Sequence, residues 1–560
     1  MPENKSEIAD PKFFLAKDGR VNAKGELEAT INALYNEERL DDNSTACLYP
    51  ARKHWLQKEL GLKDLPTVEC YDFDLLMDML KPNSATLVFP FMQGSAPSSM
   101  FGHTFLRIDG KDRPIMLSYA FNYASESDDS DNQLLYMYKG FFGGYKGTYS
   151  LLPYYEKIRE YRDLEERDIW EYELNFTEEE TQQMVRHMWE IEQAYSWYYF
   201  FTKNCSYKMF WIMESGREGL NLRKYFAFHV IPSESIRATL DEGLVLKKNY
   251  RPARSSKLEA YSKELSSSDI DDVFKIALAE LEPQVYLQKR DKTQQMQRYV
   301  LEASSEFVEY DYLKKDINES VYKQRLHKIL SARAGLGKGD SIQIPTPVDP
   351  MLSHRSFRTS VKAGMRNSEP IGFIGVRPAN HDINDFAVGL LPGTQIEFMD
   401  LLFSYTQDEL ELEKATIVSA VAFTPRTEFF QPSSWRFSVG FDREFLGEST
   451  DFRANYATGA TWGNGDNYFY LLADFIAYIE TDVYVGIGVV GGAVLHQGVN
   501  FKTNLETSQR VFSNRETQLL FSAKEHYRSS QNTALSISYE YIQKRERDFN
   551  TYTLSFDYFF

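Results

Sequence analysis

The chain has 560 residues, more than the roughly 100–200 of one ordinary domain, so we expect two or three domains. Its 81 Asp and Glu against 63 Lys and Arg give a net charge of −18. Such an acidic chain lacks the basic stripe that neutralises phosphates, and we expect no nucleic acid partner. Three cysteines are too few for a disulfide framework or a four-thiolate zinc site, which leaves room for one pair and one free thiol.

The N-terminal sequence MPENKSEIADPKFF has no basic region followed by an apolar one, so no signal peptide is predicted in this chain. The protein is then either cytoplasmic or has had a signal peptide removed. The longest apolar run, Val483–Leu495, is shorter than the roughly 20 residues of a membrane helix and is typical of a strand.

The first part of the chain predicts a helical segment followed by a mixed α+β domain. Residues 1–80 carry apolar residues at helical spacing. Residues 81–240 contain three predicted strands, SATLVFPF, HTFLRID and IMLSYAFNYA, separated by turn-forming residues. Two helices follow them in the same domain.

These two helices have recognisable starts. Thr177 and Glu180 form a capping-box signature, and the helix that they open is expected to run to about Tyr199. The second helix is expected to begin at or just after Asn204, which places Cys205 in its first turn.

The remainder predicts a helical connector and a barrel. Residues 241–350 are charged and helical and end in a Gly/Pro-rich linker at about 335–352. In residues 351–560, apolar and polar residues alternate in about twelve segments that end on Phe560. A soluble sandwich or a lipocalin-like barrel remains an alternative, but aromatic apolar faces, small polar opposite faces and a terminal aromatic strand favour an antiparallel outer-membrane barrel.

A possible thiol site is formed by three residues in the order His–Asn–Cys. His103 lies at the start of a predicted strand, Asn122 on the next strand, and Cys205 at a helix start. The helix dipole and a nearby imidazole would stabilise the Cys205 thiolate. Asn122 would accept a hydrogen bond from His103 and fix its tautomer, while backbone N–H groups of the helix would bind an oxyanion.

Other roles for these residues remain open. A single cysteine is often a small buried apolar residue, and His103 would also fit a core position. A zinc site on His103 and Cys205 is a weaker alternative, because His187 and His229 lack supporting spacing. We expect no cofactor and no metal.

The segments LVFPFMQGSAPSSMFGHTFLRID, LSYAFNYA, LEERDIWEYELNFT and YYFFTKNCSY resemble the bacterial family named for the lipoprotein N-acyltransferase Lnb, over roughly residues 40–235. The setting of His and Cys also resembles the permuted papain-like thiol enzymes related to NlpC/P60. The resemblance implies that Cys205 is the nucleophile and His103 its base. In the LEERD element, Glu166 and Arg167 are candidates for an ion pair or for shaping the pocket.

The resemblance also implies a disulfide between Cys47 and Cys70, which lie in CLYPARKHWL and LPTVECYDF, and this pairing requires an oxidising compartment. It leaves Cys205 as the free thiol. The acyltransferases continue into membrane helices, whereas this chain continues into the barrel-like segments. Candidate substrate contacts are the aromatic residues Tyr119, Tyr123, Phe141, Phe142 and Tyr207.

We therefore expect an envelope acyltransferase in the bacterial outer membrane, with its thiol domain facing the periplasm. Through a Cys205 thioester it would move an acyl chain from a phospholipid or lipoprotein ester to an amine, the N-terminus of a lipoprotein. A thiol lipase, a peptidoglycan or protein peptidase, and a non-enzymatic barrel protein are the alternatives. The oligomeric state is not predicted.

Overall fold

The structure is a computed structural model that describes residues 5–94, 97–126, 131, 133–226, 229–289, 291–406, 409–444, 450–479, 482–544 and 547–560. The chain divides into two compact units. The first comprises Met1–Phe91 and Gly102–Arg251, and the second comprises Met92–Phe101 and Pro252–Phe560.

The first unit is built on a seven-stranded antiparallel sheet. The strands follow the spatial order β6 (Ser196–Tyr198), β4 (Tyr145–Pro153), β3 (Tyr119–Ser125), β2 (Phe105–Gly110), β1 (Pro82–Pro90), β5 (Ile169–Leu174) and β7 (Val245–Arg251). The sheet therefore sets the three predicted strands β1, β2 and β3 side by side in its centre, and the start of β2 lies near His103 and Asn122.

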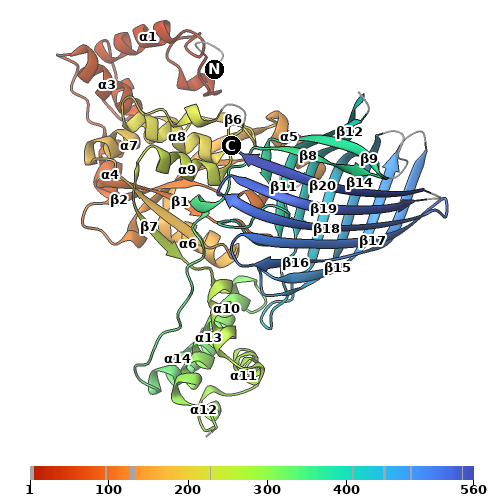
Figure 1. Cartoon of the computed structure of the whole chain (residues 1–560). Helices are drawn as coiled ribbons and strands as arrows, with labels where there is room; N and C mark the ends of the chain where they lie inside the picture. The colour runs from red at the N-terminus through yellow and green to blue at the C-terminus, as the bar shows by residue number, and fades with distance from the viewer. Residues whose placement is uncertain are drawn as a thin grey trace. The chain divides into compact units, whose positions relative to one another are not determined.

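Helices surround this sheet (Figure 1). The nucleophile candidate begins α8 (Cys205–Gly216), which packs against α7 (Glu178–Glu192) and contacts β2 and β3. The others are α1 (Ala23–Tyr35), α2 (Thr45–Leu48), α3 (Pro50–Leu60), α4 (Tyr71–Leu80), α5 (Gln133–Phe142), α6 (Tyr154–Ile158) and α9 (Pro232–Asp241).

Two sequence predictions for this unit are wrong in detail. The helix that Thr177 opens does have a complete capping box, but it ends at Glu192 and not near Tyr199. The aromatic residues beyond it form β6, which pairs with β4, because aromatic side chains fit a pleated sheet better than a helix interior. The connector was predicted to be helical from residue 241, but its first residues form β7, an edge strand that pairs with β5.

The second unit contains a small helical bundle. Its helices are α10 (Arg254–Glu264), α11 (Ser267–Ala277), α12 (Pro283–Tyr286), α13 (Gln294–Leu313) and α14 (Glu319–Gly335). Their buried core includes Leu258, Val273 and Leu301. Phe429, from the connection between two barrel strands, is buried in the same core. The helical connector is therefore packed onto the barrel unit through apolar contacts.

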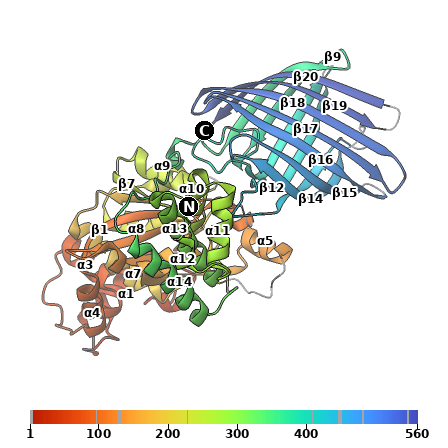
Figure 2. The ribbon, with the colours of Figure 1, turned by 90° about the horizontal axis from the view of Figure 1, so that it is seen from below.

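A closed antiparallel barrel of twelve strands forms the rest of this unit, as Figures 1 and 2 show. The ring is closed because β20 pairs with β8 and β9 pairs with β11. The short strand β10 (Ala379–His381) pairs with β11 in addition. The ring strands are β8 (Arg358–Arg366), β9 (Glu369–Arg377), β11 (Thr394–Thr406), β12 (Glu409–Ala422), β13 (Ser434–Asp442), β14 (Asp451–Gly463), β15 (Tyr468–Ile479), β16 (Val483–Gln497), β17 (Phe501–Phe512), β18 (Thr517–Ser530), β19 (Thr533–Lys544) and β20 (Arg547–Phe559).

The barrel has an apolar outer face and a polar inner face. Along β15, Phe469, Leu471 and Phe475 are about half exposed, whereas Asp474 on the inner face is 1% exposed. This alternation is the inverse of a soluble barrel, whose apolar face points inward. Among the helices of the described residues, none is both long and apolar enough to cross a membrane.

Candidate functional site

The first turn of α8 positions the candidate nucleophile. Asn204 is the N-cap, and its side-chain oxygen accepts a hydrogen bond from the Tyr207 amide at 3.3 Å. Its Nδ2 donates to the carbonyl oxygens of Phe200 (2.9 Å) and Val230 (2.6 Å). The cap is therefore fixed on both sides, which places Cys205 as the first helical residue, 3% exposed.

The base candidate and its orienting residue come from neighbouring strands. His103 lies two residues before β2, and Asn122 lies on β3, which pairs with β2. The His103 Nε2 and the Asn122 Oδ1 are 2.6 Å apart. Because an amide oxygen can only accept, Nε2 carries the hydrogen, and Nδ1 is the ring nitrogen left for the thiol.

Electrostatics favour an ionised thiol. Burial raises the pKa of Cys205, but the charge of His103 and a hydrogen bond with its ring outweigh burial and lower the pKa from 9.0 to about 7. Burial lowers the pKa of His103, yet its attraction to Cys205 raises that pKa overall. Both shifts stabilise the thiolate–imidazolium pair, which is the reactive form of a thiol nucleophile.

Hydroxyl groups complete the surroundings of the sulfur. The Thr104 Oγ1 lies 4.0 Å from the Cys205 Sγ, and the Ser206 Oγ lies 3.9 Å from it. The two hydroxyls are 2.7 Å from each other. Because one hydroxyl donates to the other, a single hydrogen remains to form a weak bond with the thiolate.

An aromatic layer that the sequence reasoning missed supports His103. Tyr161 stacks on the imidazole with ring centroids 5.6 Å apart and planes at 24°. It belongs to a π-helical turn, Arg159–Leu164, of the kind that is frequent at functional sites. The sequence around it, REYRDL, has no signal that predicts such a turn.

Arg167 lies behind Tyr161. Its guanidinium carbon is 5.6 Å from the centroid of the Tyr161 ring, and its charge acts to lower the pKa of His103. Arg167 pairs with Glu165 at 2.6 Å. Glu166 has a positive φ of 55°, in the turn that precedes β5.

The N-terminal segment also contacts the nucleophile helix. The Glu7 carboxylate lies 2.9 Å from the Nζ of Lys208, which is fully buried on α8, and accepts a hydrogen bond from the Tyr207 hydroxyl at 2.6 Å. A buried ammonium without a partner would strongly destabilise the helix. Glu7 thus joins residues outside the thiol-domain core to α8.

The predicted aromatic contacts are spread over several places. Phe141 on α5 stacks on Phe201, with centroids 5.1 Å apart, in the segment that leads to Asn204. Tyr123 is fully buried and stacks on Tyr198. Both rings therefore contact residues of the segment that precedes α8.

The other three predicted aromatics point elsewhere. The Tyr119 hydroxyl donates to the Met79 sulfur, and the Tyr207 hydroxyl is bound to Glu7. Phe142 is 70% exposed and packs on Tyr138 with the ring planes tilted by 43°. The structure therefore does not gather all five aromatic residues around Cys205.

The disulfide implied by the resemblance is present. Cys47 and Cys70 are bonded, which links α2 to the start of α4, and Cys205 is free. Within the described residues, no group of three or more His, Cys, Asp or Glu is arranged to hold a metal ion.

Fold and site together define a thiol domain with a Cys–His–Asn arrangement, followed by a helical bundle and a twelve-stranded barrel. Residues 73–242 match the family model of the Lnb N-terminal periplasmic domain. The other parts match domain families of unknown function: DUF7843 at residues 1–59, DUF7842 at 248–345 and DUF7840 at 347–559.

Solved structures similar to the chain include two porins and an outer-membrane protein. A KdgM porin is 10% identical with a TM-score of 0.25, and a NanC porin is 12% identical with a TM-score of 0.25; each comparison covers 36% of this chain and 99% of the other. OmpT of Vibrio cholerae is 7% identical, with a TM-score of 0.21 over 36% of this chain and 98% of the other. Similarity at this level says nothing about substrates. No curated protein matches the chain.

Proposed function

We propose that the protein is a cysteine-dependent acyltransferase of the bacterial envelope. The observation that carries the proposal is the free thiol of Cys205 at a helix start, with its pKa lowered to about 7 by His103, which is itself held by Asn122 at 2.6 Å. This combination supplies an ionised nucleophile, a base of fixed tautomer and helix amides for an oxyanion.

The proposed reaction has two halves. The Cys205 thiolate attacks the carbonyl carbon of an acyl ester, and the His103 imidazolium gives its proton to the leaving alkoxide, which departs as an alcohol. The acyl group is then held as a thioester. An amine attacks this thioester, His103 accepts the proton of the amine, and the products are an amide and the regenerated thiolate.

A lipid acyl donor fits the surroundings of the nucleophile better than a peptide does. The chain before Asn204 is aromatic, with Phe201 stacked on Phe141 and Phe200 in edge contact with it. An apolar surface accepts an acyl chain and also excludes the water that would hydrolyse the thioester. We take the acceptor to be the amine of a lipoprotein N-terminus, in keeping with the matched family.

The same proposal places the barrel in the outer membrane. Its outward face carries aromatic and aliphatic residues on successive strands, and its inner face carries charged pairs. An apolar band facing outward is stable in lipid but would be costly in water. The periplasm, which is oxidising, would also maintain the Cys47–Cys70 disulfide.

Mass spectrometry of reaction products tests the function. The full-length protein in detergent is incubated with phospholipid and a synthetic diacylated lipopeptide, with Cys205→Ala as the matched control. A lipopeptide heavier by one acyl chain, formed only with wild type, supports the transferase. Lysophospholipid and free fatty acid without that gain would identify a lipase. If wild type leaves the lipids unchanged, the proposal is wrong and peptide substrates become the next test.

A further inference from the structure

The connection between β9 and β11 enters the barrel instead of forming a simple turn. We refer to its residues Asp382–Phe386 as the crossbar. The preceding residues form β10, which pairs with β11 on one wall. From β10 the chain continues into the crossbar, whose hydrogen bonds to another strand of the barrel define its path.

The far contacts of the crossbar are on β17. The Lys502 Nζ donates to the backbone oxygen of Asp385 at 2.6 Å and to that of Ile383. The Asn504 Nδ2 donates to the Asn384 Oδ1 at 2.8 Å. In the ring, five strands separate β17 from β11 in either direction, so the two are diametrically opposite. A segment that pairs near β11 and bonds to β17 must cross the lumen.

The near end of the crossbar is held by charge. Arg377, the last residue of β9 and 0% exposed, bonds to Asp382 at 3.0 Å and to Asp385 at 2.5 Å. Arg358, the first residue of β8, bonds to Asp382 at 2.6 Å. One fully buried guanidinium, one partly buried guanidinium and two buried carboxylates thus fix the segment, and charge-assisted hydrogen bonds of this kind are strong.

Apolar contacts reach a third part of the wall. Phe386 is buried against Ala534 on β19 and Phe559 on β20. With Lys502 near the start of β17 and Phe559 at the end of β20, every anchor lies at the barrel end where the chain enters β8. The crossbar is therefore held at three separate places around that single end.

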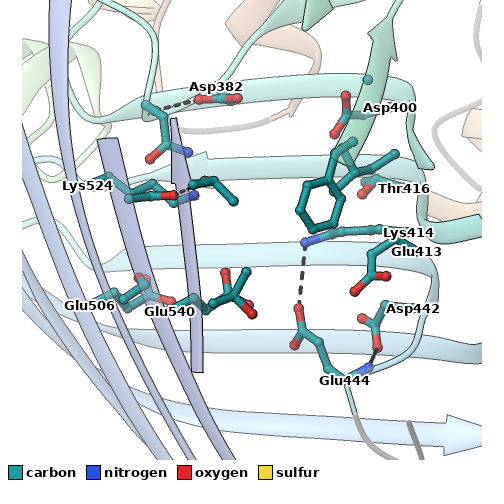
Figure 3. Close-up of a pocket in the computed structure, with 18 of the residues that line it drawn as sticks. Asp382, Asp400, Glu413, Lys414, Thr416, Asp442, Glu444, Glu506, Lys524 and Glu540 are labelled. Atoms are coloured by element: carbon teal, nitrogen blue, oxygen red, sulfur yellow. Dashed lines mark hydrogen bonds and ion pairs between the residues drawn. The ribbon is translucent and has the colours of Figure 1, made fainter. Parts of the chain in front are cut away.

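Beyond the crossbar, the lumen is a polar cavity of about 620 Å³. Asp382, Ile383 and Asn384 line it at the crossbar, and it reaches Thr406 and Arg443 at the opposite end of the barrel. Figure 3 shows charged wall residues such as Lys524 and Glu506 around this space, together with Asp382. The crossbar, which is bonded across the barrel, thus lines one end of the cavity.

We propose that the crossbar closes the lumen at the end where the chain enters, so that the barrel is a membrane anchor with a blind polar cavity and not an open channel. The latch is the set of bonds from Lys502 and Asn504 to the crossbar. This inference rests on the barrel being in a membrane, but it is independent of the thiol chemistry, so conductance and acyl transfer can fail separately.

Conductance in planar bilayers tests the closure on the full-length protein. We expect few openings for wild type and a gain of steady conductance for Lys502→Met/Asn504→Leu, which keep side-chain volume but remove the latch. The matched control is Arg366→Gln, because Arg366 lines the same lumen and pairs with Glu413 at 2.7 Å without touching the crossbar. Steady conductance of wild type, or no gain in a folded latch variant, would overturn the proposal.

A second measurement covers the case in which the latch variant does not fold. Asn384→Cys/Asn504→Cys is made in a Cys205→Ala background, and disulfide formation is followed by mass spectrometry after mild oxidation. The side chains of Asn384 and Asn504 touch in the structure, so we expect an efficient bond and a barrel that stays closed. Failure to form the bond in the folded protein would exclude a crossbar that spans the lumen.

Discussion

The Cys205 thiol lies beside Thr104, which is 101 residues earlier in the sequence, and beside the neighbouring His103. The chemistry of the thiol therefore depends on its position in the fold more than on residue type. The helix start, the imidazole and two hydroxyls act on one sulfur. Removing any of them should move a measurable property of the thiol, which gives two predictions at this scale.

His103→Ala should raise the pKa of Cys205 from about 7 to at least its ordinary 9.0, because burial would then act without the opposing imidazole. In wild type the thiolate population rises as pH increases through about 7, and in the variant it should rise only in a more alkaline range. Ultraviolet thiolate absorbance, measured as the difference from Cys205→Ser, follows this change. An unchanged midpoint would mean that His103 does not interact with the thiol.

Asn122→Ala should lower the rate constant of the reaction by about 100-fold, since a base that is free to rotate loses its productive geometry. The Michaelis constant should change little, because Asn122 acts on His103 and not on the acyl group. Asn122→Asp keeps an acceptor at the same place and should recover part of the rate. A structural defect would instead lower both variants alike, which the folded fraction by circular dichroism would reveal.

At the scale of elements, the central sheet fixes the distances within the site, and a buried ion cluster ties that sheet together. Glu171 on β5 lies 2.9 Å from Arg107 on β2 and also bonds Arg251 on β7. Arg107 in turn pairs with Asp109 at 2.6 Å. The cluster therefore joins β2 to β5 and β7 across β1, and β2 is the strand that follows His103.

Glu171→Gln should reduce the free energy of unfolding by about 3–5 kcal/mol, because it breaks the buried ion pair with Arg107 and leaves Asp109 as the remaining carboxylate beside that guanidinium. Burial raises the pKa of Glu171, but Arg251 and Arg107 outweigh it and lower the pKa from 4.5 to about 2. The resulting stabilisation is complete above pH 4.5 and is lost as pH falls toward 2. Denaturant midpoints should show this loss in wild type and not in Glu171→Gln, with the exposed Glu173→Gln as control.

The sequence predicts the elements that carry strong local signals. The capping box of Thr177 and Glu180, the start of α8 and the central strands are where their patterns place them. The end of α7 could not be predicted in the same way, because the residues that follow it form β6 by pairing with β4. The strand β7 likewise depends on its pairing with β5. Tyr161 is a similar case, since its role depends on a π-turn that tertiary packing stabilises.

For the whole molecule, the barrel connections are unequal at the two ends. The long connections 378–393 and 423–433 lie at the end where the chain enters β8, and one enters the lumen while the other joins the helical bundle through Phe429. Both therefore serve contacts within the protein. The strand that closes the ring is the last one, β20, which pairs with β19 and β8.

Deletion of Phe560 should impair assembly of the barrel. Its amide donates to the Phe357 carbonyl oxygen at 2.9 Å, and its ring lies 4.5 Å from that of Phe357, so it extends the closing pair β20–β8 by one residue. The fraction of protein in membranes that shows heat-modifiable migration on gels should fall. Phe501→Ala, which changes an exposed aromatic away from the closing pair, serves as control. Normal assembly without Phe560 would show that β20 needs no terminal aromatic.

By itself, the sequence determined the class of each part of the chain: period-two alternation specifies a strand with an apolar face, and a capped apolar helix specifies the start of α8. It also supplied His103, Asn122 and Cys205 as candidates. Only the tertiary structure decided that His103 rests on Tyr161, that Glu7 neutralises Lys208, and that the crossbar spans the barrel. The physical reason is that these contacts join residues far apart in the chain, whose pairing energy depends on a folded geometry that no local pattern encodes.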